Sequence, residues 1–306
     1  MKKRVCKGLL CLCLLVWAIH AAGKLTLPTT LADPLCAVRA ITRQPRDRYD
    51  ALIFGSSHAW KGVDTRVLRD MGISAYNMAT DWQRINTVNL FVQAALKRQH
   101  PRVVLIETFY VNDVTQKTDL NGEIYMSKNL PPSMAKARYL TRCFGRDPER
   151  YLSYLVPIVA FHENWKDIKR RTFVPERNEE QFSESLGYYV SDAVTPQVLP
   201  DIRSLPQNEL IPQARRELDE LVAACRRKGV EVLFFTIPYN GEYRDVEAIR
   251  AYAQENGCRY VNLFDEVEAL GIDEASDYQD TDHLNAAGAG KIARRLGEIL
   301  RESYSL

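Results

Sequence analysis

The sequence lacks an excess of charge of either sign. Its 41 Lys and Arg residues against 39 Asp and Glu give a formal net charge of +2. No Lys/Arg run has the length and interleaved aromatics of a nucleic-acid face. The densest basic stretch, KDIKRRTFVPER at 166–177, is more typical of a solvated helix face than of a polyanion-binding patch. We therefore expect no nucleic-acid partner.

Metal-binding cysteine patterns are also absent. None of the seven cysteines lies in a CxxC motif or at a zinc-type spacing from histidine, so we expect no metal and no cofactor. Cys225 falls on an apolar helical face and Cys258 opens a predicted strand, so both are interpreted as free thiols that are buried. Disulfides are permitted outside the cell, but a domain of this size does not require them.

A long hydrophobic run occurs at the N-terminus. After the cationic MKKRVCK, an apolar run extends from Gly8 to Gly23, longer than most signal-peptide cores and slightly short of a comfortable membrane span. The preceding positive charges favour export of the rest of the chain. Residues 1–23 are interpreted as a signal-anchor, slightly favoured over a cleaved signal peptide, and 24–48 as a linker. We expect a single-pass membrane protein with an extracytoplasmic domain, or a secreted one after cleavage.

Residues 49–306 alternate between short apolar strands and amphipathic helices. Strands are predicted at 50–54, 74–78, 102–109, 230–238 and 258–264, and helices at 63–72, 83–99, 208–229, 243–257 and 286–304. Asn285 is the expected N-cap of the last helix. The alternation predicts a parallel sheet covered on both faces. A stretch rich in Tyr, Pro and charge, at about 115–207, interrupts it and is interpreted as one long, partly helical insertion.

Polar residues gather where the predicted strands end. Gly55-Ser56-Ser57-His58 follows the first strand, Asn112-Asp113 follows the third, and DYQDTDHLN at 277–285 precedes the last helix. In an open parallel sheet, ligands bind beyond the carboxyl ends of the strands, so these segments are expected at one edge.

A serine hydroxyl is a weak nucleophile that needs an imidazole base, and the imidazole needs a carboxylate to set its tautomer. Asp280 and His283 supply both on one predicted turn, and Ser57 supplies the hydroxyl. Each piece alone is common, since Gly-Ser-Ser is often only a turn and DxxH arises by chance. The three together, each at a strand end or before a helix, are more specific.

Two other arrangements of these residues are weaker. An α/β-hydrolase nucleophile elbow at Gly55-Ser56-Ser57-His58-Ala59 needs several strands before its serine, and the chain has no room for them. A metal site made of His58, Asp280 and His283 lacks the three or four clustered ligands that metals prefer.

Four segments resemble the blocks of the SGNH (GDSL-type) hydrolase superfamily: IFGSSHAW, YNMATDW, YVND and DTDHLNAAGAGKIA. The resemblance covers roughly residues 50–112 and 230–303. The opening block is similar to the membrane-anchored branch that includes teichoic-acid D-alanylation and alginate O-acetylation proteins. FHENW, at 161–165, also resembles a His/Trp feature of that branch.

The resemblance implies a fold and a set of roles. The fold is a three-layer α/β/α sandwich with a mainly parallel, flavodoxin-like sheet. The implied roles are Ser57 as nucleophile, His283 as base and Asp280 as its orienting acid, with Ser57, Trp82 and Asn112 as oxyanion donors. His58, next to the nucleophile, is interpreted as a packing or substrate-contacting residue, and His162 as a structural histidine or a substrate-contacting residue. The sequence departs from the family pattern at Ser56, which replaces an aspartate, and in the second block, where Asp81 or Trp82 stands in place of a glycine.

The resemblance also implies an activity. We expect an extracytoplasmic serine-dependent O-acyl esterase or acyltransferase that acts on cell-envelope polymers through an acyl-enzyme on Ser57. Its partners would be an acylated carbohydrate or a teichoic-acid-like polymer, and a membrane-bound acyltransferase. The alternative is a catalytically weak SGNH-like module that binds a glycan or a protein of the cell envelope.

Overall fold

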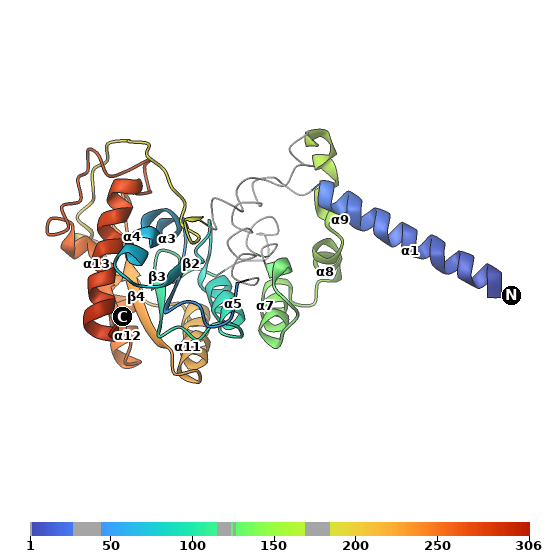
Figure 1. The fold of residues 1–306 in the computed structure, drawn as a ribbon, viewed down its shortest axis with the longest axis horizontal. Coiled ribbons are helices and arrows are strands. Elements are labelled where there is room, and N and C mark those ends of the chain that lie inside the picture. The colour runs from blue at the N-terminus through green and yellow to red at the C-terminus, as the bar shows by residue number, and fades with distance from the viewer. Residues whose placement is uncertain (1, 27–43, 115–123, 125–126, 169–183) are drawn as a thin grey trace.

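The computed structural model describes residues 2–26, 44–114, 124, 127–168 and 184–306. Most of the predicted linker, parts of the predicted insertion and most of the basic stretch at 166–177 lie outside the described residues. Figure 1 shows the sheet with helices on both sides, and a helical region that separates it from the projecting N-terminal helix.

The sheet is entirely parallel. Its strands are β1 (Ala51–Phe54), β2 (Ala75–Asn77), β3 (Val103–Glu107), β4 (Glu231–Thr236) and β5 (Arg259–Asn262). They lie in the order β2-β1-β3-β4-β5. The chain adds β2 on one side of β1 and β3 on the other, so the strand order reverses between β1 and β3. Ligand sites of doubly wound sheets lie at this switch point, beyond the carboxyl ends of the strands.

Helices cover both faces of the sheet, which confirms the predicted three-layer α/β/α class. The helices are α3 (Ser57–Gly62), α4 (Thr65–Asp70), α5 (Ile85–Ala95), α11 (Pro212–Arg226), α12 (Val246–Glu255) and α13 (Ala286–Tyr304). Alternate strand residues face opposite layers, so Leu52 and Phe54 join the core under α5, α11 and α12, whereas Ala51 and Ile53 join the core under α3, α4 and α13. Both faces are therefore dry, and the strands are continuous apolar runs.

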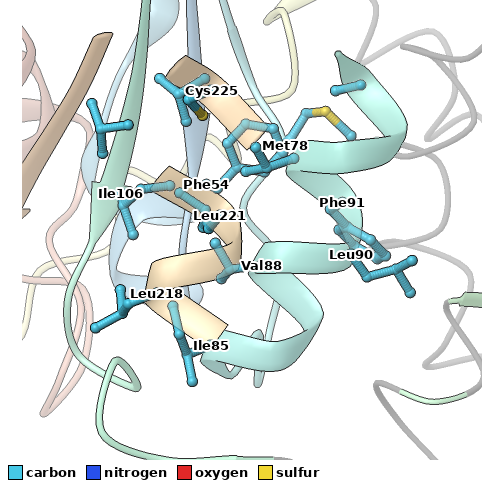
Figure 2. Packing of buried hydrophobic residues seen from close by; sticks show 14 of the residues in the cluster. Phe54, Met78, Ile85, Val88, Leu90, Phe91, Ile106, Leu218, Leu221 and Cys225 are labelled. Atoms are coloured by element: carbon cyan, nitrogen blue, oxygen red, sulfur yellow. The ribbon is translucent and has the colours of Figure 1, made fainter. Parts of the chain in front are cut away.

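The core between the sheet and its first helical layer is drawn in Figure 2. Ile85 and Val88 of α5 meet Leu218 and Leu221 of α11, next to the strand side chains. Leu218 and Leu221 have no exposed surface. Burying a side chain of this size is typically worth about 1.5–3 kcal/mol, so this layer fixes the strands whose ends carry the polar residues.

Two helix starts show how the sequence sets the boundaries. Asn285 caps α13 by accepting the N–H groups of Ala287 and Gly288, as predicted. The stretch after β1, in contrast, is not only a turn, because Ser56 caps a short helix, α3, that begins at Ser57. The predicted helix at 63–72 is a separate helix, α4, which begins at Thr65 and is capped by Asp64.

The insertion contributes α7 (Met134–Phe144), α8 (Pro148–Leu155), α9 (Pro157–Phe161) and the 3₁₀ segments η2 (Ser127–Asn129), η3 (His162–Asp167) and η5 (Ile202–Ser204); η6 (Leu263–Glu266) follows β5. α7 packs on α5, and α9 packs on the N-terminal helix α1 (Lys2–Leu25).

Cys225 is a buried free thiol, as predicted, and Cys258 is a free thiol that is only partly buried.

Candidate functional site

The loop after β1 has a fixed backbone shape. β1 ends at Phe54, and Gly55 adopts φ +147°, a conformation that favours glycine. Ser56 is fully buried, and its hydroxyl accepts the N–H of His58. Ser57 is therefore the first residue of α3 and remains partly exposed.

The structure brings Ser57, His283 and Asp280 into one hydrogen-bonded series. The Ser57 Oγ lies 2.7 Å from Nε2 of His283. Nδ1 of the same ring lies 2.8 and 3.0 Å from the two carboxylate oxygens of Asp280. Asp280 Oδ1 also accepts the backbone N–H groups of Asp282 and His283, each at 2.9 Å, which fixes the turn. This order of hydroxyl, imidazole and carboxylate is the one that activates a serine.

The electrostatics of this series favour a neutral imidazole beside an ionised carboxylate. Burial lowers the pKa of His283, and the nearby Lys61 ammonium lowers it further, although Asp280 acts in the opposite direction. Burial tends to raise the pKa of Asp280, but hydrogen bonds from the Asp282 N–H and from His283 lower it overall. A neutral imidazole with its Nδ1–H on Asp280 leaves Nε2 free to accept the serine proton.

Lys61 should set the pH at which this base becomes active. Its Nζ lies 3.5 Å from Nδ1 of His283. Because the ammonium disfavours the imidazolium, Lys61→Met should raise the pKa of His283 and move the acid limb of the kcat/KM profile to higher pH. The exposed Lys97 provides the control, since Lys97→Met should leave the limb in place. A limb that stays fixed or moves to lower pH in Lys61→Met would contradict the assignment of that limb to His283.

Glu107, the last residue of β3, forms a second buried cluster under the loop. Its Oε2 accepts the Ser56 N–H at 3.0 Å and the Ser56 hydroxyl at 2.7 Å, and its Oε1 accepts the Phe109 N–H at 2.6 Å. The Ser56 Oγ lies 3.1 Å from Nδ1 of His58. Glu107 therefore joins the end of β3 to the loop that carries Ser57.

The pKa values of the ionisable groups in this cluster differ strongly from their ordinary values. Burial raises the pKa of Glu107 to about 7, although hydrogen bonds from Ser56 and Phe109 oppose the change. Burial lowers the pKa of His58 well below its usual value, and His283 and Lys61 lower it further. Glu107 can therefore change charge near neutral pH while His58 stays neutral.

Gly55 is the position where this packing tolerates no side chain. A Cβ there would lie 2.5 Å from Cβ of Glu107. Gly55→Ala should therefore lower the free energy of unfolding by about 2–4 kcal/mol through overpacking and backbone strain. Gly229→Ala is the matched control, because Gly229 also has positive φ, at +67°, but meets no atom within 4 Å. Equal losses in urea unfolding would show that the Glu107 contact contributes nothing.

The loop after β2 is tied to the same site. Gln83 Oε1 accepts the Gly55 N–H at 3.0 Å, and Gln83 Nε2 donates to the Met78 carbonyl at 2.9 Å. Trp82 adopts φ +57°, the left-handed region that favours glycine. Its side chain is exposed and stacks on Tyr110, with ring centroids 6.0 Å apart. Trp82, one of the two residues predicted to stand in place of a glycine, thus has a backbone conformation that favours glycine.

Asn112 does not have the predicted role. Its side-chain amide donates to the Glu209 carbonyl at 2.9 Å and to Asp245 at 3.0 Å, and its Oδ1 accepts the Ile211 N–H. Both amide protons are therefore already used, and Asn112 joins the end of the insertion to the start of α12. The expectation that it donates to an oxyanion is corrected on this ground.

The two histidines weighed as substrate-contacting residues lie in different surroundings. His58 is only 4% exposed, with its ring between those of Phe109, at 4.1 Å, and Tyr239, at 4.8 Å. Its Nε2 is buried and has no hydrogen-bond partner among the described residues. His162 is exposed in η3, where its Nδ1 lies 3.3 Å from the Val159 carbonyl, and the nearby Asn164 donates to the Thr26 carbonyl just after α1.

The metal alternative finds no support in this geometry. His58 Nδ1 is directed to Ser56, and His283 directs its two nitrogens to Asp280 and Ser57. Within the described ranges, no group of three or more His, Cys, Asp and Glu side chains could hold a metal ion.

Three residues of the site were not anticipated: Lys61, Gln83 and Glu107. Glu107 did leave a signal, since a carboxylate that ends the apolar run RVVLIE is unusual in a strand buried on both faces. Nothing in the local sequence marked Lys61 or Gln83, because their partners are distant in the chain.

Comparison with known proteins gives a structural likeness but no sequence match. No protein-family model and no curated protein sequence matches the chain. Among solved structures, a protein from Bacteroides fragilis NCTC 9343 described as a "putative acylhydrolase" matches over 87% of this chain and 95% of its own, with 10% sequence identity and a TM-score of 0.42. A likeness of this strength says nothing about activity, which has to be argued from the site.

Proposed function

We propose that the protein is a serine-dependent O-acyl esterase or acyltransferase. The observation that carries this proposal is the unbroken series from Ser57 through His283 to Asp280, with Ser57 Oγ 2.7 Å from the imidazole. The series stands at the switch point of a doubly wound sheet, the usual ligand position of such folds. The resemblance of four sequence segments to the SGNH blocks supports the same conclusion.

The reaction would proceed in two steps. His283 takes the Ser57 proton as Oγ attacks the ester carbonyl, and it then gives that proton to the leaving alcohol as the ester bond breaks. Water or a sugar hydroxyl next attacks the acyl-enzyme while His283 takes its proton and returns it to Ser57. Asp280 stabilises the imidazolium in both steps. The backbone N–H groups of Ser57 and Trp82 would receive the oxyanion, since Asn112 is engaged elsewhere.

The proposed acceptor is a cell-envelope polymer. The N-terminal helix supports an extracytoplasmic place for the enzyme, and the family resemblance supports an acylated carbohydrate or teichoic-acid-like polymer, handled together with a membrane-bound acyltransferase. The exposed Trp82, stacked on Tyr110, offers a flat aromatic surface next to the site. Aromatic side chains of this kind commonly line ligand sites.

The test is covalent labelling of the full-length protein in mild detergent. A fluorophosphonate should attach to Ser57, identified by peptide mass, and acetyl esters should turn over. Adding a polysaccharide acceptor then separates transfer to sugar from hydrolysis. No label on Ser57, together with equal turnover by wild type and Ser57→Ala, would contradict the proposal.

One observation favours the alternative of a catalytically weak binding module. Asn112, the expected side-chain donor to the oxyanion, is held by Asp245 and Glu209. A missing donor typically costs about 10²–10³ in kcat. An unlabelled Ser57 combined with measurable binding of an envelope glycan would establish this alternative.

A further inference from the structure

The C-terminal end of α1 is built into the insertion. An apolar segment, Arg4–Gly23, is long enough to cross a membrane, and almost all of it is exposed. At its end, a Cβ on Gly23 would lie 3.3 Å from Pro157, so α9 packs directly on the helix. Thr26 is buried, and its carbonyl accepts the Asn164 amide at 3.0 Å. Figure 1 shows α9 beside this end of α1.

The contact between α1 and α9 determines how deep α9 and η3 lie relative to the bilayer. If Arg4–Gly23 crosses the hydrocarbon, the residues packed on Gly23 lie at the level where the helix leaves it. α9 and η3 then stand in the headgroup region rather than in bulk water. The side chains that they and α8 leave exposed are therefore the ones to consider.

Those exposed side chains are large and apolar. Leu152 is 51% exposed, Leu155 65%, Val159 40% and Trp165 63%. They come from the consecutive elements α8, α9 and η3, and the first three follow at spacings of three and four residues. The Lys166 ammonium stands over the Trp165 ring at 6.0 Å. Tryptophan and lysine together are typical of the membrane interface, where one end of a side chain is apolar and the other wet.

We propose that Leu152, Leu155, Val159 and Trp165, here called the α8–η3 surface, lie against the lipid headgroup region beside the C-terminal end of α1. The proposal rests on the membrane-anchor part of the proposed function. Lipid is the occupant because the surface is continuous with a helix whose own apolar surface requires lipid. Burial in the interface also removes the cost of exposing four large apolar side chains to water.

The experiment uses tryptophan fluorescence of the full-length protein in phosphatidylcholine–phosphatidylglycerol liposomes. Phospholipids brominated near the headgroup quench tryptophans at that level, whereas phospholipids brominated deeper in the acyl chains quench tryptophans within the hydrocarbon. Trp165→Phe should reduce the quenched share of the emission. Trp82→Phe is the matched control, because Trp82 is 59% exposed but lies beside the sheet, and its loss should increase the quenched share.

Trp17→Phe separates the two claims that are being tested. Trp17 lies within α1, about 9 Å along the axis from Gly23, so its loss should reduce the share quenched by the deeper bromines if α1 spans the bilayer. A change for Trp17→Phe with none for Trp165→Phe overturns the α8–η3 surface while the anchor stands, and points to a protein partner on that surface. No change for either overturns both. Neither result bears on labelling of Ser57, so the enzymatic proposal is judged independently.

Discussion

Ser57→Ala should lower kcat for ester turnover by roughly 10⁵-fold, and adding His283→Ala to it should cost little more. The reason is that the hydroxyl and its base act as one unit, so removing either leaves only binding and oxyanion stabilisation. Asp280→Asn should cost about 10⁴-fold, because the amide favours the wrong imidazole tautomer. The measurement is kcat on a chromogenic acetyl ester, with single and double variants compared.

Ser74→Ala is the control for this series. Ser74 lies just before β2, at the amino ends of the strands, whereas Ser57 lies beyond their carboxyl ends. The Ser74 hydroxyl donates to the Arg48 carbonyl. It should retain wild-type turnover. Losses that multiply when Ser57→Ala and His283→Ala are combined would mean that the two residues act separately, and the series would not be the reacting unit.

Glu107 should make the stability of the protein fall as pH rises. The pKa of its carboxyl is about 7 in the folded state against an ordinary 4.5, so the folded protein keeps a proton that the unfolded chain has released. The stabilisation is full below pH 4.5 and is lost as pH rises through 7. Between pH 5 and pH 8 it should amount to about 2.5 kcal/mol.

Glu107→Gln isolates this contribution, because glutamine does not ionise. Urea unfolding at several pH values should show a difference between wild type and variant that changes with pH by that amount. All other ionisable groups are common to both proteins, so the difference between the two isolates position 107. Glu231→Gln is the control, since Glu231 is an exposed glutamate at the start of β4. A wild-type-like slope in Glu107→Gln would contradict a buried, proton-holding Glu107.

The sequence was sufficient to predict those features that depend on residues close together in the chain. Apolar strands, glycine stops and the Asn285 cap predicted the parallel sheet and the last helix, because each depends on neighbours along the chain. Asp280 and His283 could be paired for the same reason, as they share one turn. That Ser57 meets them agrees with the general rule that parallel strand ends gather at one edge.

Residues that depend on distant partners could not be predicted. The role predicted for Asn112 is wrong because its amide is bound by Asp245 and Glu209, which no local pattern connects to it. Glu107 is part of a predicted strand, and nothing nearby in the chain indicates that its carboxylate binds Ser56 across the sheet edge. The start of α3 was not predicted, because the sequence alone does not show that Ser56 is buried and caps a helix.

The order of the reacting groups along the chain has a consequence for biosynthesis. Ser57 leaves the ribosome 226 residues before His283, which lies with Asp280 on the turn before α13, and α13 packs on α3. A nascent or prematurely terminated chain therefore carries the hydroxyl without its base. The proposed activity could therefore begin only after α13 is made and docked, so products that end before α13 would lack it.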